Sequence, residues 1–201
     1  MDKLCQAGDV DGERYRLAAQ KVKNSINDIL WDEQKGYYVN YVDGDFIEDN
    51  LSVDTVLVYL FGISNEVRSN RMLDAMENLL ETKNNQLQEA GDYGVMCVYP
   101  FYKGVYSSYG KSSQDYEYHN GGNWPYWSAI YAYAKFLAGR EWRYALESWF
   151  SYNLERGIFT PVEYFSPCRK SGSTLQAWSG AAAFTLDFID KDSFFAPNHL
   201  K

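Results

Sequence analysis

Apolar residues recur every three or four positions in several separate stretches of this 201-residue chain. That spacing places them on one face of an α-helix, and each such face has to be buried against another element. The predicted helices run over about 11–30, 52–61, 65–81, 123–139, 141–154 and 174–189. Short glycine-containing links, such as 62–64 and 139–140, join consecutive helices in pairs. The pattern predicts an all-α fold assembled from helical hairpins.

Each predicted helix has an apolar face that we expect to lie in the core. The inward residues, helix by helix, are Tyr15, Ala18, Val22, Ile26, Ile29 and Leu30; Val53, Val56, Leu57 and Leu60; Met72, Leu73, Met76, Leu79 and Leu80; Trp127, Ile130, Tyr131, Ala134, Leu137 and Ala138; Trp142, Ala145, Leu146 and Trp149; Leu175, Trp178, Ala182 and Leu186. Ser64 and Asn123 are predicted N-caps, Pro125 suits a first helical turn, and Gly139 suits a helix end.

Two long stretches, 82–123 and 156–173, lack helical periodicity. Loops of this length inside a compact domain usually serve a function. We expect a short strand near 95–98 within the first of them. Between the first two predicted helices, alternating aromatic residues bounded by turn residues over 31–45 predict a short β-hairpin or an extended loop.

The acidic composition limits the partners of the chain. Its net charge is -8, without a basic run that could neutralise phosphates, so we expect neither nucleic acid nor an anionic membrane surface as partner. No apolar run approaches the roughly 20 residues of a membrane span. The first residues lack the apolar core of a signal peptide, which favours the cytoplasm as the expected location.

The cysteines and histidines do not predict a metal or redox centre. Cys5, Cys97 and Cys168 are far apart and odd in number, which is typical of buried or incidental thiols. His119 and His199 are the two histidines, so a histidine-rich metal site is not expected, although carboxylates could still hold calcium. We expect no cofactor.

One stretch, 114–127, combines aromatic rings, amides, carboxylates and two adjacent glycines just before a predicted helix. Flat aromatic faces beside hydrogen-bonding groups suit a sugar ring, which is apolar on its C–H face and polar at its edge. The candidate ligand contacts are Tyr118, His119, Asn123, Trp124 and Trp127. The alternative is a structural loop whose tryptophans pack in the core.

Three motifs resemble those of one enzyme group. They are Leu30–Tyr38, with the sequence LWDEQKGYY; Tyr118–Pro125, with the sequence YHNGGNWP; and Glu163–Pro167, with the sequence EYFSP, followed by Gln176–Ser179, with the sequence QAWS. In this order and spacing the chain resembles the C-terminal half of (α/α)6-toroid glycoside hydrolases. That group contains glycogen-debranching amylo-α-1,6-glucosidases, processing α-glucosidases and mannosylglycerate hydrolases.

The resemblance implies a fold and a chemistry. The fold would be part of a six-hairpin toroid, with residues 1–201 as a single domain. The activity would be inverting hydrolysis of an α-linked, glucose-like sugar, for which two carboxyl groups are needed. Glu163 would be the general base. Trp124, His119 and Trp178 would line the innermost sugar subsite, and Gln176 would also bind the substrate. An oligosaccharide or glycoside would be the partner.

The position of the general acid is the main departure from the resemblance. In the related enzymes this aspartate lies upstream of the Leu-Trp-Asp-Glu motif, where this chain offers no match. Asp49, Asp54 and Asp115 are the internal candidates, and Asp115 lies within the aromatic stretch 114–127. The missing N-terminal half of the toroid, or a second copy of the chain, is therefore an expected partner.

Two other classes of function remain open. A non-catalytic helical module could bind carbohydrate or pack on a partner chain, because half a toroid leaves apolar surface uncovered. Helical toroids also host sugar epimerases and lyases, since a fold does not determine the chemistry. The small number of histidines argues against the epimerase version.

Overall fold

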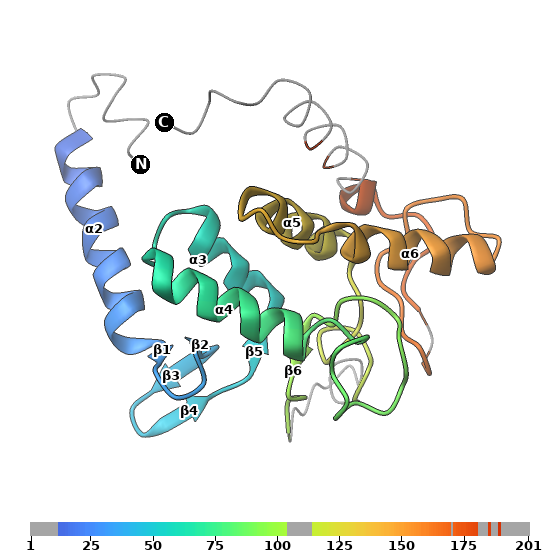
Figure 1. The fold of residues 1–201 in the computed structure, drawn as a ribbon, viewed down its shortest axis with the longest axis horizontal. Coiled ribbons are helices and arrows are strands. Elements are labelled where there is room, and N and C mark those ends of the chain that lie inside the picture. Colours follow the sequence, from blue (N-terminus) through green and yellow to red (C-terminus); the bar gives the residue numbers. More distant parts are fainter. Residues whose placement is uncertain (1–11, 104–113, 170, 181–184, 186–188, 190–201) are drawn as a thin grey trace.

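The structure is a computed structural model that describes residues 12–103, 114–169, 171–180, 185 and 189. Helices dominate this part of the chain (Figure 1). In chain order they are α2 (Gly12–Ile29), the 3₁₀ helix η1 (Val53–Thr55), α3 (Val56–Leu60), α4 (Glu66–Leu79), α5 (Pro125–Leu137), α6 (Arg143–Glu155) and the 3₁₀ helix η2 (Ala177–Gly180). The helix-rich class predicted from the apolar spacing is confirmed.

The strands are short and form separate antiparallel pairs. They are β1 (Trp31–Asp32) with β2 (Tyr37–Tyr38), β3 (Tyr41–Asp43) with β4 (Phe46–Glu48), and β5 (Leu51–Ser52) with β6 (Val98–Tyr99). The first two pairs confirm the hairpin predicted over 31–45. Gly36 and Gly44 make their turns with φ of 75° and 57°, values that side chains with a Cβ rarely adopt. The strand expected near 95–98 is β6.

The helix predicted over 52–61 is shorter than expected. Ser52 belongs to β5, where it pairs with Val98, and the N–H of Val53 donates to the carbonyl of Cys97 at 2.8 Å. The α-helix therefore begins only at Val56, after one 3₁₀ turn. Long-range strand pairing takes up the main-chain groups that the apolar spacing assigned to a helix.

The predicted caps are partly right. Asn65, and not Ser64, caps α4, because its side chain accepts a hydrogen bond from the N–H of Arg68 at 2.9 Å. The Ser64 hydroxyl instead lies 2.6 Å from the hydroxyl of Ser69. At the end of α5, Gly139 has a φ of 67°, as expected of the residue that terminates a helix.

The core lies between α4, α5 and the loops that follow them. The predicted faces of these helices and of α6 are largely confirmed, and α5 packs against both α3 and α6 (Figure 1). The buried residues on them are Met72, Leu73, Met76, Leu80, Tyr131, Ala132, Ala134, Ala145, Leu146 and Trp149. Tyr93, Met96 and Cys97, from the long stretch without helical periodicity, lie in the same core.

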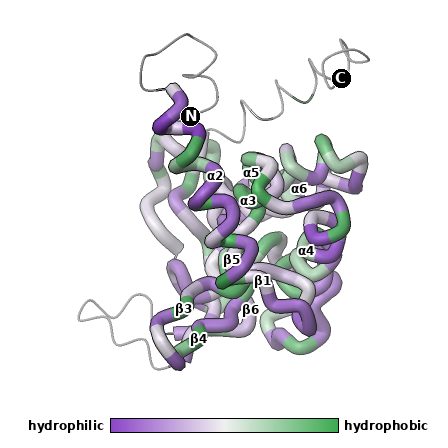
Figure 2. Tube along the Cα trace, turned by 90° about the vertical axis from the view of Figure 1, so that its left-hand side faces the viewer, coloured by the Kyte–Doolittle hydropathy of each residue, from purple (hydrophilic) through white to green (hydrophobic). Residues whose placement is uncertain are grey.

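Helix α2 forms as predicted, but most of its apolar face is not buried. Of that face, Ala18, Val22 and Ile29 are exposed, the last two by more than half, and hydrophobic residues interrupt the hydrophilic tube along α2 in Figure 2. The contacts of α2 with the α3–α4 link include the amide of Asn27, which donates to the carbonyl of Ile63 at 3.0 Å. Apolar spacing identifies a helix face, but it does not say whether another element covers that face.

The last predicted helix also differs from expectation. Residues 174–176 are not helical, the 3₁₀ helix η2 follows them, and of the later residues that the structure describes, Thr185 and Ile189 are helical. Leu175 and Trp178, expected inward, are 69% and 52% exposed, whereas Ile189 is buried. The expected inward positions Ala182 and Leu186 lie outside the described residues. None of the described helices combines the length and the apolar character that a membrane crossing requires.

Candidate functional site

Two segments that are far apart in the sequence pair side by side. The N–H of Asn123 donates to the carbonyl of Phe165, and the N–H of Phe165 donates to the carbonyl of Asn123, both at 2.9 Å. This two-bond bridge joins the aromatic stretch before α5 to the loop that carries Glu163. The two motifs that the sequence places about forty residues apart therefore lie at one place in the fold.

Five rings gather at this bridge. Tyr118 packs edge-on against His119, Trp124 and Tyr164, with ring centroids 4.1, 5.1 and 5.4 Å away. The ring of His119 is parallel to the indole of Trp124 at 4.6 Å, and Tyr164 stacks on the same indole at 5.3 Å. Trp178 lies 6.5 Å from Trp124. Of the predicted ligand contacts, Tyr118, His119, Trp124 and Trp178 thus form one cluster.

The members of this cluster differ in what they offer to a ligand. Trp124 is only 5% exposed because His119 and Tyr164 cover it, so it supports the other rings from within. Trp178 is half exposed and His119 is also exposed. The aromatic surface available to a sugar ring therefore comes from Trp178 and His119.

The loop before α5 folds tightly on itself to place these rings. Tyr118 has a φ of 46°, an uncommon value for a residue with a side chain. Its carbonyl accepts a hydrogen bond from the indole of Trp124 at 3.0 Å. A Cβ at Gly122 would lie 2.6 Å from that same carbonyl, so the close approach requires glycine.

The carboxylate of Glu163 is held by the segment that follows its loop. Its Oε2 accepts a hydrogen bond from the N–H of Ser173 at 3.1 Å, and the Glu163 N–H donates to the Ser173 carbonyl at 2.8 Å. The N–H of Gly172 donates to the carbonyl of Tyr164 at 3.0 Å. A Cβ at Gly172 would lie 2.6 Å from the Glu163 Oε2, so the carboxylate occupies space that glycine leaves open.

Electrostatic interactions connect the rings and the carboxylates. Partial burial lowers the pKa of His119, while the negative charges of Glu163 and Asp54 act to raise it. Burial raises the pKa of Tyr164 to about 12, and the charges of Glu117 and Glu163 add to this effect. At neutral pH the hydroxyl of Tyr164 is therefore protonated and can donate a hydrogen bond beside Glu163.

Three other predicted contacts lie in different surroundings. Asn123 is fully buried, and its side chain donates to the Tyr93 carbonyl at 3.1 Å and accepts from the Ser128 hydroxyl at 2.8 Å. It does not cap α5, where Trp124 holds the cap position without a side-chain cap bond. Trp127 is half-buried with its ring 5.2 Å from that of Tyr126.

Gln176 lies close to the Glu163 loop through its main chain. Its N–H donates to the carbonyl of Pro161 at 2.8 Å, which ties the segment before η2 to the start of that loop. The hydroxyl of Ser179, within η2, donates to the Glu163 carbonyl at 3.4 Å. The bonds from Gln176 and Ser179 therefore hold the segment that carries Trp178 next to Glu163.

The carboxyl groups considered as acids differ in their surroundings. Asp115 is exposed in a turn, and within the described residues it has no hydrogen bond or ion pair with Glu163. Asp49 forms an ion pair with Lys35, which lowers the pKa of that carboxyl. Asp54 is exposed, and its charge acts on His119, as does that of Glu163. No cluster of three His, Cys, Asp or Glu residues that could hold a metal ion occurs in the described part of the chain.

Sequence reasoning missed several residues of this site. Tyr164 lies inside the quoted EYFSP motif, where its position next to Glu163 could have identified it. Gly172 and Ser173 follow the motif in a polar stretch, and no sequence pattern marks them as the holders of Glu163. Their role depends on a chain reversal that only the structure shows.

Comparison with known proteins agrees with the three motifs. Among curated proteins, no match to the chain is found. A family profile described as amylo-alpha-1,6-glucosidase matches residues 1–185, which contain the aromatic stretch, Glu163 and the segment before and through η2. The match covers most of the chain, and it supports the interpretation of a glycoside hydrolase-like domain. The chain therefore belongs to the amylo-alpha-1,6-glucosidase family.

Proposed function

We propose that the chain binds an α-linked, glucose-like saccharide beside Trp178 and His119, and that Glu163 is the general base of inverting hydrolysis. The observation that carries this proposal is the main-chain bridge between Asn123 and Phe165, which unites a half-exposed aromatic cluster with a positioned carboxylate. An aromatic face supports the C–H side of a sugar, and polar groups around it bind the hydroxyls.

Glu163 has the features of a base that activates water. Its carboxylate is half-buried, and the Ser173 N–H holds one of its oxygens. In the proposed reaction the carboxylate takes a proton from water, and the water oxygen bonds to the anomeric carbon. The bond from that carbon to the leaving oxygen breaks at the same time, and a carboxylic acid gives that oxygen a proton.

The proton donor stays a prediction, with three candidates within the chain. Asp115 is the candidate that the sequence favours. Asp54 is supported by its charge, which acts on the imidazole of His119 as the charge of Glu163 does. Asp49 is a weak candidate because its ion pair with Lys35 lowers its pKa, whereas an acid catalyst needs a raised one.

At the scale of the fold, we propose that residues 1–201 form one domain that corresponds to the C-terminal half of an (α/α)6 toroid. Consecutive helices connected by short links, such as α3 and α4, are the observation that favours it. In this arrangement the remaining helices, and with them the family's usual acid, would come from another half of the toroid or from a second copy.

The decisive experiment follows the anomer released first, by proton NMR, from α-linked gluco-oligosaccharides mixed with the 201-residue chain. An inverting enzyme acting on an α-linkage gives the β-anomer. Glu163→Gln should lower kcat by about 10²-fold or more, because a positioned proton acceptor is lost. Glu66→Gln, on the exposed first turn of α4, is the matched control and should keep full activity.

Each outcome discriminates between parts of the proposal. Full activity of Glu163→Gln would overturn the role of Glu163. The α-anomer as first product would overturn inversion. Saccharide binding without turnover would support the binding site and place the hydrolytic step in a longer assembly. If neither binding nor turnover occurs, the proposed function fails.

A second candidate, a non-catalytic module that packs on a partner chain, is favoured by one observation. The apolar face of α2 is largely exposed at Val22 and Ile29. A chain that is monomeric by sedimentation and lacks any affinity for saccharides would contradict this alternative as well.

A further inference from the structure

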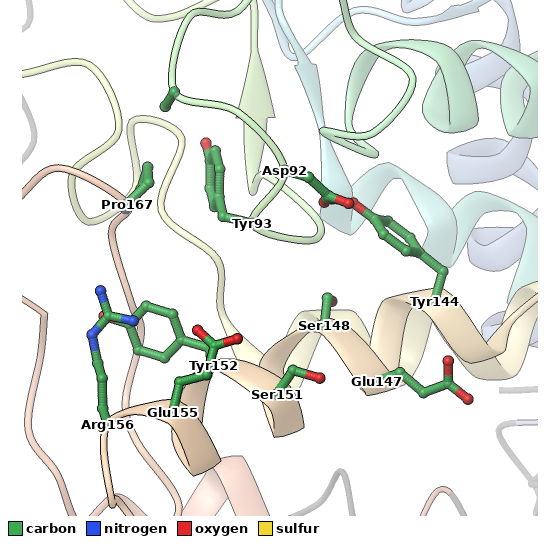
Figure 3. Close-up of a pocket in the computed structure, with 11 residues that line it drawn as sticks. Asp92, Tyr93, Tyr144, Glu147, Ser148, Ser151, Tyr152, Glu155, Arg156 and Pro167 are labelled. Atoms are coloured by element: carbon green, nitrogen blue, oxygen red, sulfur yellow. Dashed lines mark hydrogen bonds between the residues drawn. The ribbon is translucent and has the colours of Figure 1, made fainter.

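A cleft lies beside the candidate site, between α6 and the loop before β6. Its volume is about 470 Å³, within the range of about 300–1,000 Å³ that is usual for small-molecule sites. Figure 3 shows Asp92 and Tyr93 on one side of the cleft and Ser148, Ser151 and Tyr152, from α6, on the other. The cleft therefore forms where three segments meet, since Pro167 also contributes to its wall.

The lining combines hydrogen-bond acceptors and donors. Carboxylates of Asp92, Glu147 and Glu155 line the cleft together with the guanidinium of Arg156. Asp92 is fixed in place, because its Oδ1 accepts from the hydroxyl of Tyr144 at 2.5 Å. Arg156 lies over the ring of Tyr152, 3.7 Å from its centroid.

This lining selects among classes of ligand. Three carboxylates disfavour an anion, and the prevalence of polar side chains disfavours an apolar molecule. A cation would face the guanidinium of Arg156. A neutral polyhydroxyl compound can use both signs of charge, because its hydroxyls donate to Asp92 and Glu155 and accept from Arg156 and Ser151.

We propose that this cleft is a second saccharide site, which binds a neutral gluco-oligosaccharide separately from the Glu163 site. The choice of a saccharide over other polyols rests on the proposed function of the Glu163 site.

The cleft is connected to both segments of the candidate site. The hydroxyl of Tyr93 donates to the carbonyl of Gly121 at 2.8 Å, within the aromatic stretch. The ring of Tyr152 stacks on Phe165 at 3.9 Å, and its hydroxyl lies 2.7 Å from that of Ser171, next to Gly172. A saccharide bound in the cleft would lie against Tyr93 and Tyr152, which themselves contact the aromatic stretch and the Glu163 loop.

The test is an NMR titration of the 201-residue chain with maltotriose, and separately with spermidine as a cationic probe. The backbone amides of Ser148, Ser151 and Glu155 report on the cleft, and the indole N–H of Trp178 reports on the Glu163 site. We expect maltotriose to shift both sets of signals. Ser151→Phe, which puts a bulky ring into the cleft from an exposed position on α6, should remove the cleft response and leave that of Trp178.

A second variant removes only a charge. Glu155→Gln should weaken maltotriose binding in the cleft by about tenfold, because it replaces a charged acceptor with a neutral one. Leu154→Phe is the control for Ser151→Phe, since Leu154 is exposed on α6 and does not line the cleft. Asp28→Asn, on an exposed position of α2, is the control for the charge change. Both controls should bind as the parent chain does.

The outcomes separate this proposal from the proposed function. A response of Trp178 alone would overturn the second site and leave the proposed function standing. A response of the cleft alone would support the second site and count against saccharide binding at Glu163. A cleft that responds to spermidine and not to maltotriose, or that does not respond at all, overturns the proposal.

Discussion

At the scale of single residues, the position of the Glu163 carboxylate depends on a glycine on the neighbouring segment. A Cβ at Gly172 would lie 2.6 Å from Oε2 of Glu163 and within 2.8 Å of two ring carbons of Tyr164. Such contacts are shorter than packed atoms tolerate, so a methyl group there must displace the carboxylate, the ring or the strand-like pairing of Gly172 with Tyr164.

Gly172→Ala is therefore expected to lower the free energy of unfolding by about 1–3 kcal/mol, measured by urea denaturation. Gly180→Ala is the matched control, because a Cβ there meets nothing within 4 Å. Its effect should stay within about 0.5 kcal/mol or be slightly stabilising. Equal stability losses in the two variants would contradict the crowding argument.

The imidazole of His119 gives a direct measure of how close the carboxylates are. Burial lowers its pKa, and Glu163 and Asp54 partly offset this effect. Glu163→Gln and Asp54→Asn should therefore each lower the pKa of His119 further, as followed by proton NMR of the imidazole. Asp115 is the acid candidate that the sequence favours, and Asp115→Asn tests whether its charge also acts on His119. A shift of the His119 pKa in Asp115→Asn, with none in Asp54→Asn, would favour Asp115 as the neighbour of the site.

The lowered pKa of His119 also makes the stability of the chain depend on pH. Because folding lowers the pKa of His119, the unfolded chain binds more protons than the folded one as the pH falls below the ordinary value of about 6.5. The contribution of His119 to stability is thus complete above this pH and is lost as the pH falls toward the folded pKa. In His119→Gln the unfolding free energy, measured from about pH 7 to pH 5, should fall less steeply than in the parent chain.

At the scale of the elements, a buried ion pair fastens α5 to the end of α4. The ammonium of Lys135 lies 2.5 Å from Oε1 of Glu81, and both side chains are 2% exposed. Tyr131 donates to the same oxygen at 3.1 Å, and Glu77 lies 3.3 Å from Lys135. The pair therefore links a helix of the core to the segment that leads into the long aromatic loop.

Lys135→Met should destabilise the chain by about 3–5 kcal/mol, because it leaves the Glu81 carboxylate buried without this cation. The double variant Lys135→Met/Glu81→Gln should cost less than the sum of the two single variants, since it removes both charges. Urea denaturation of the four proteins gives this coupling as a double-mutant cycle. Strict additivity would show that the two charges do not interact in the folded state.

Elements with strong local signals were predictable from the sequence, and those made by long-range pairing were not. Helices α2, α4, α5 and α6 begin and end within a few residues of the predicted limits, because apolar spacing, Pro125 and Gly139 are local features. Strand β5 replaced the start of a predicted helix, because its partner β6 lies more than forty residues away. The main-chain bridge between Asn123 and Phe165 has the same origin, so sequence reasoning identified both motifs without their contact.

At the scale of the whole molecule, the helices differ in how far the rest of the chain covers them. In α5, several residues including Tyr131, Ala132 and Ala134 are buried, whereas Gly12 is the buried residue of α2. Helix α2 therefore depends on contacts near its C-terminal end and on whatever covers its exposed face. Elements with few buried apolar contacts open with a lower free energy than core elements.

Hydrogen exchange followed by mass spectrometry should show faster exchange of the amides of α2 than of those of α5 at low protein concentration. Protection of α2 that rises with concentration would indicate that a second copy covers Val22 and Ile29. Equal protection of the two helices at the lowest concentration would contradict the exposure of α2 seen in the structure.

The sequence by itself determined where α2, α4, α5 and α6 form, which stretches lack helical periodicity, and which three motifs relate the chain to its family, because these properties depend on residues close together in the chain. The tertiary structure alone decided which apolar faces are covered, that Trp124 is buried among other rings while Trp178 is exposed, and that Gly172 and Ser173 hold the Glu163 carboxylate. These features depend on contacts between distant segments, and such contacts follow from how the whole chain packs and pairs its main-chain groups.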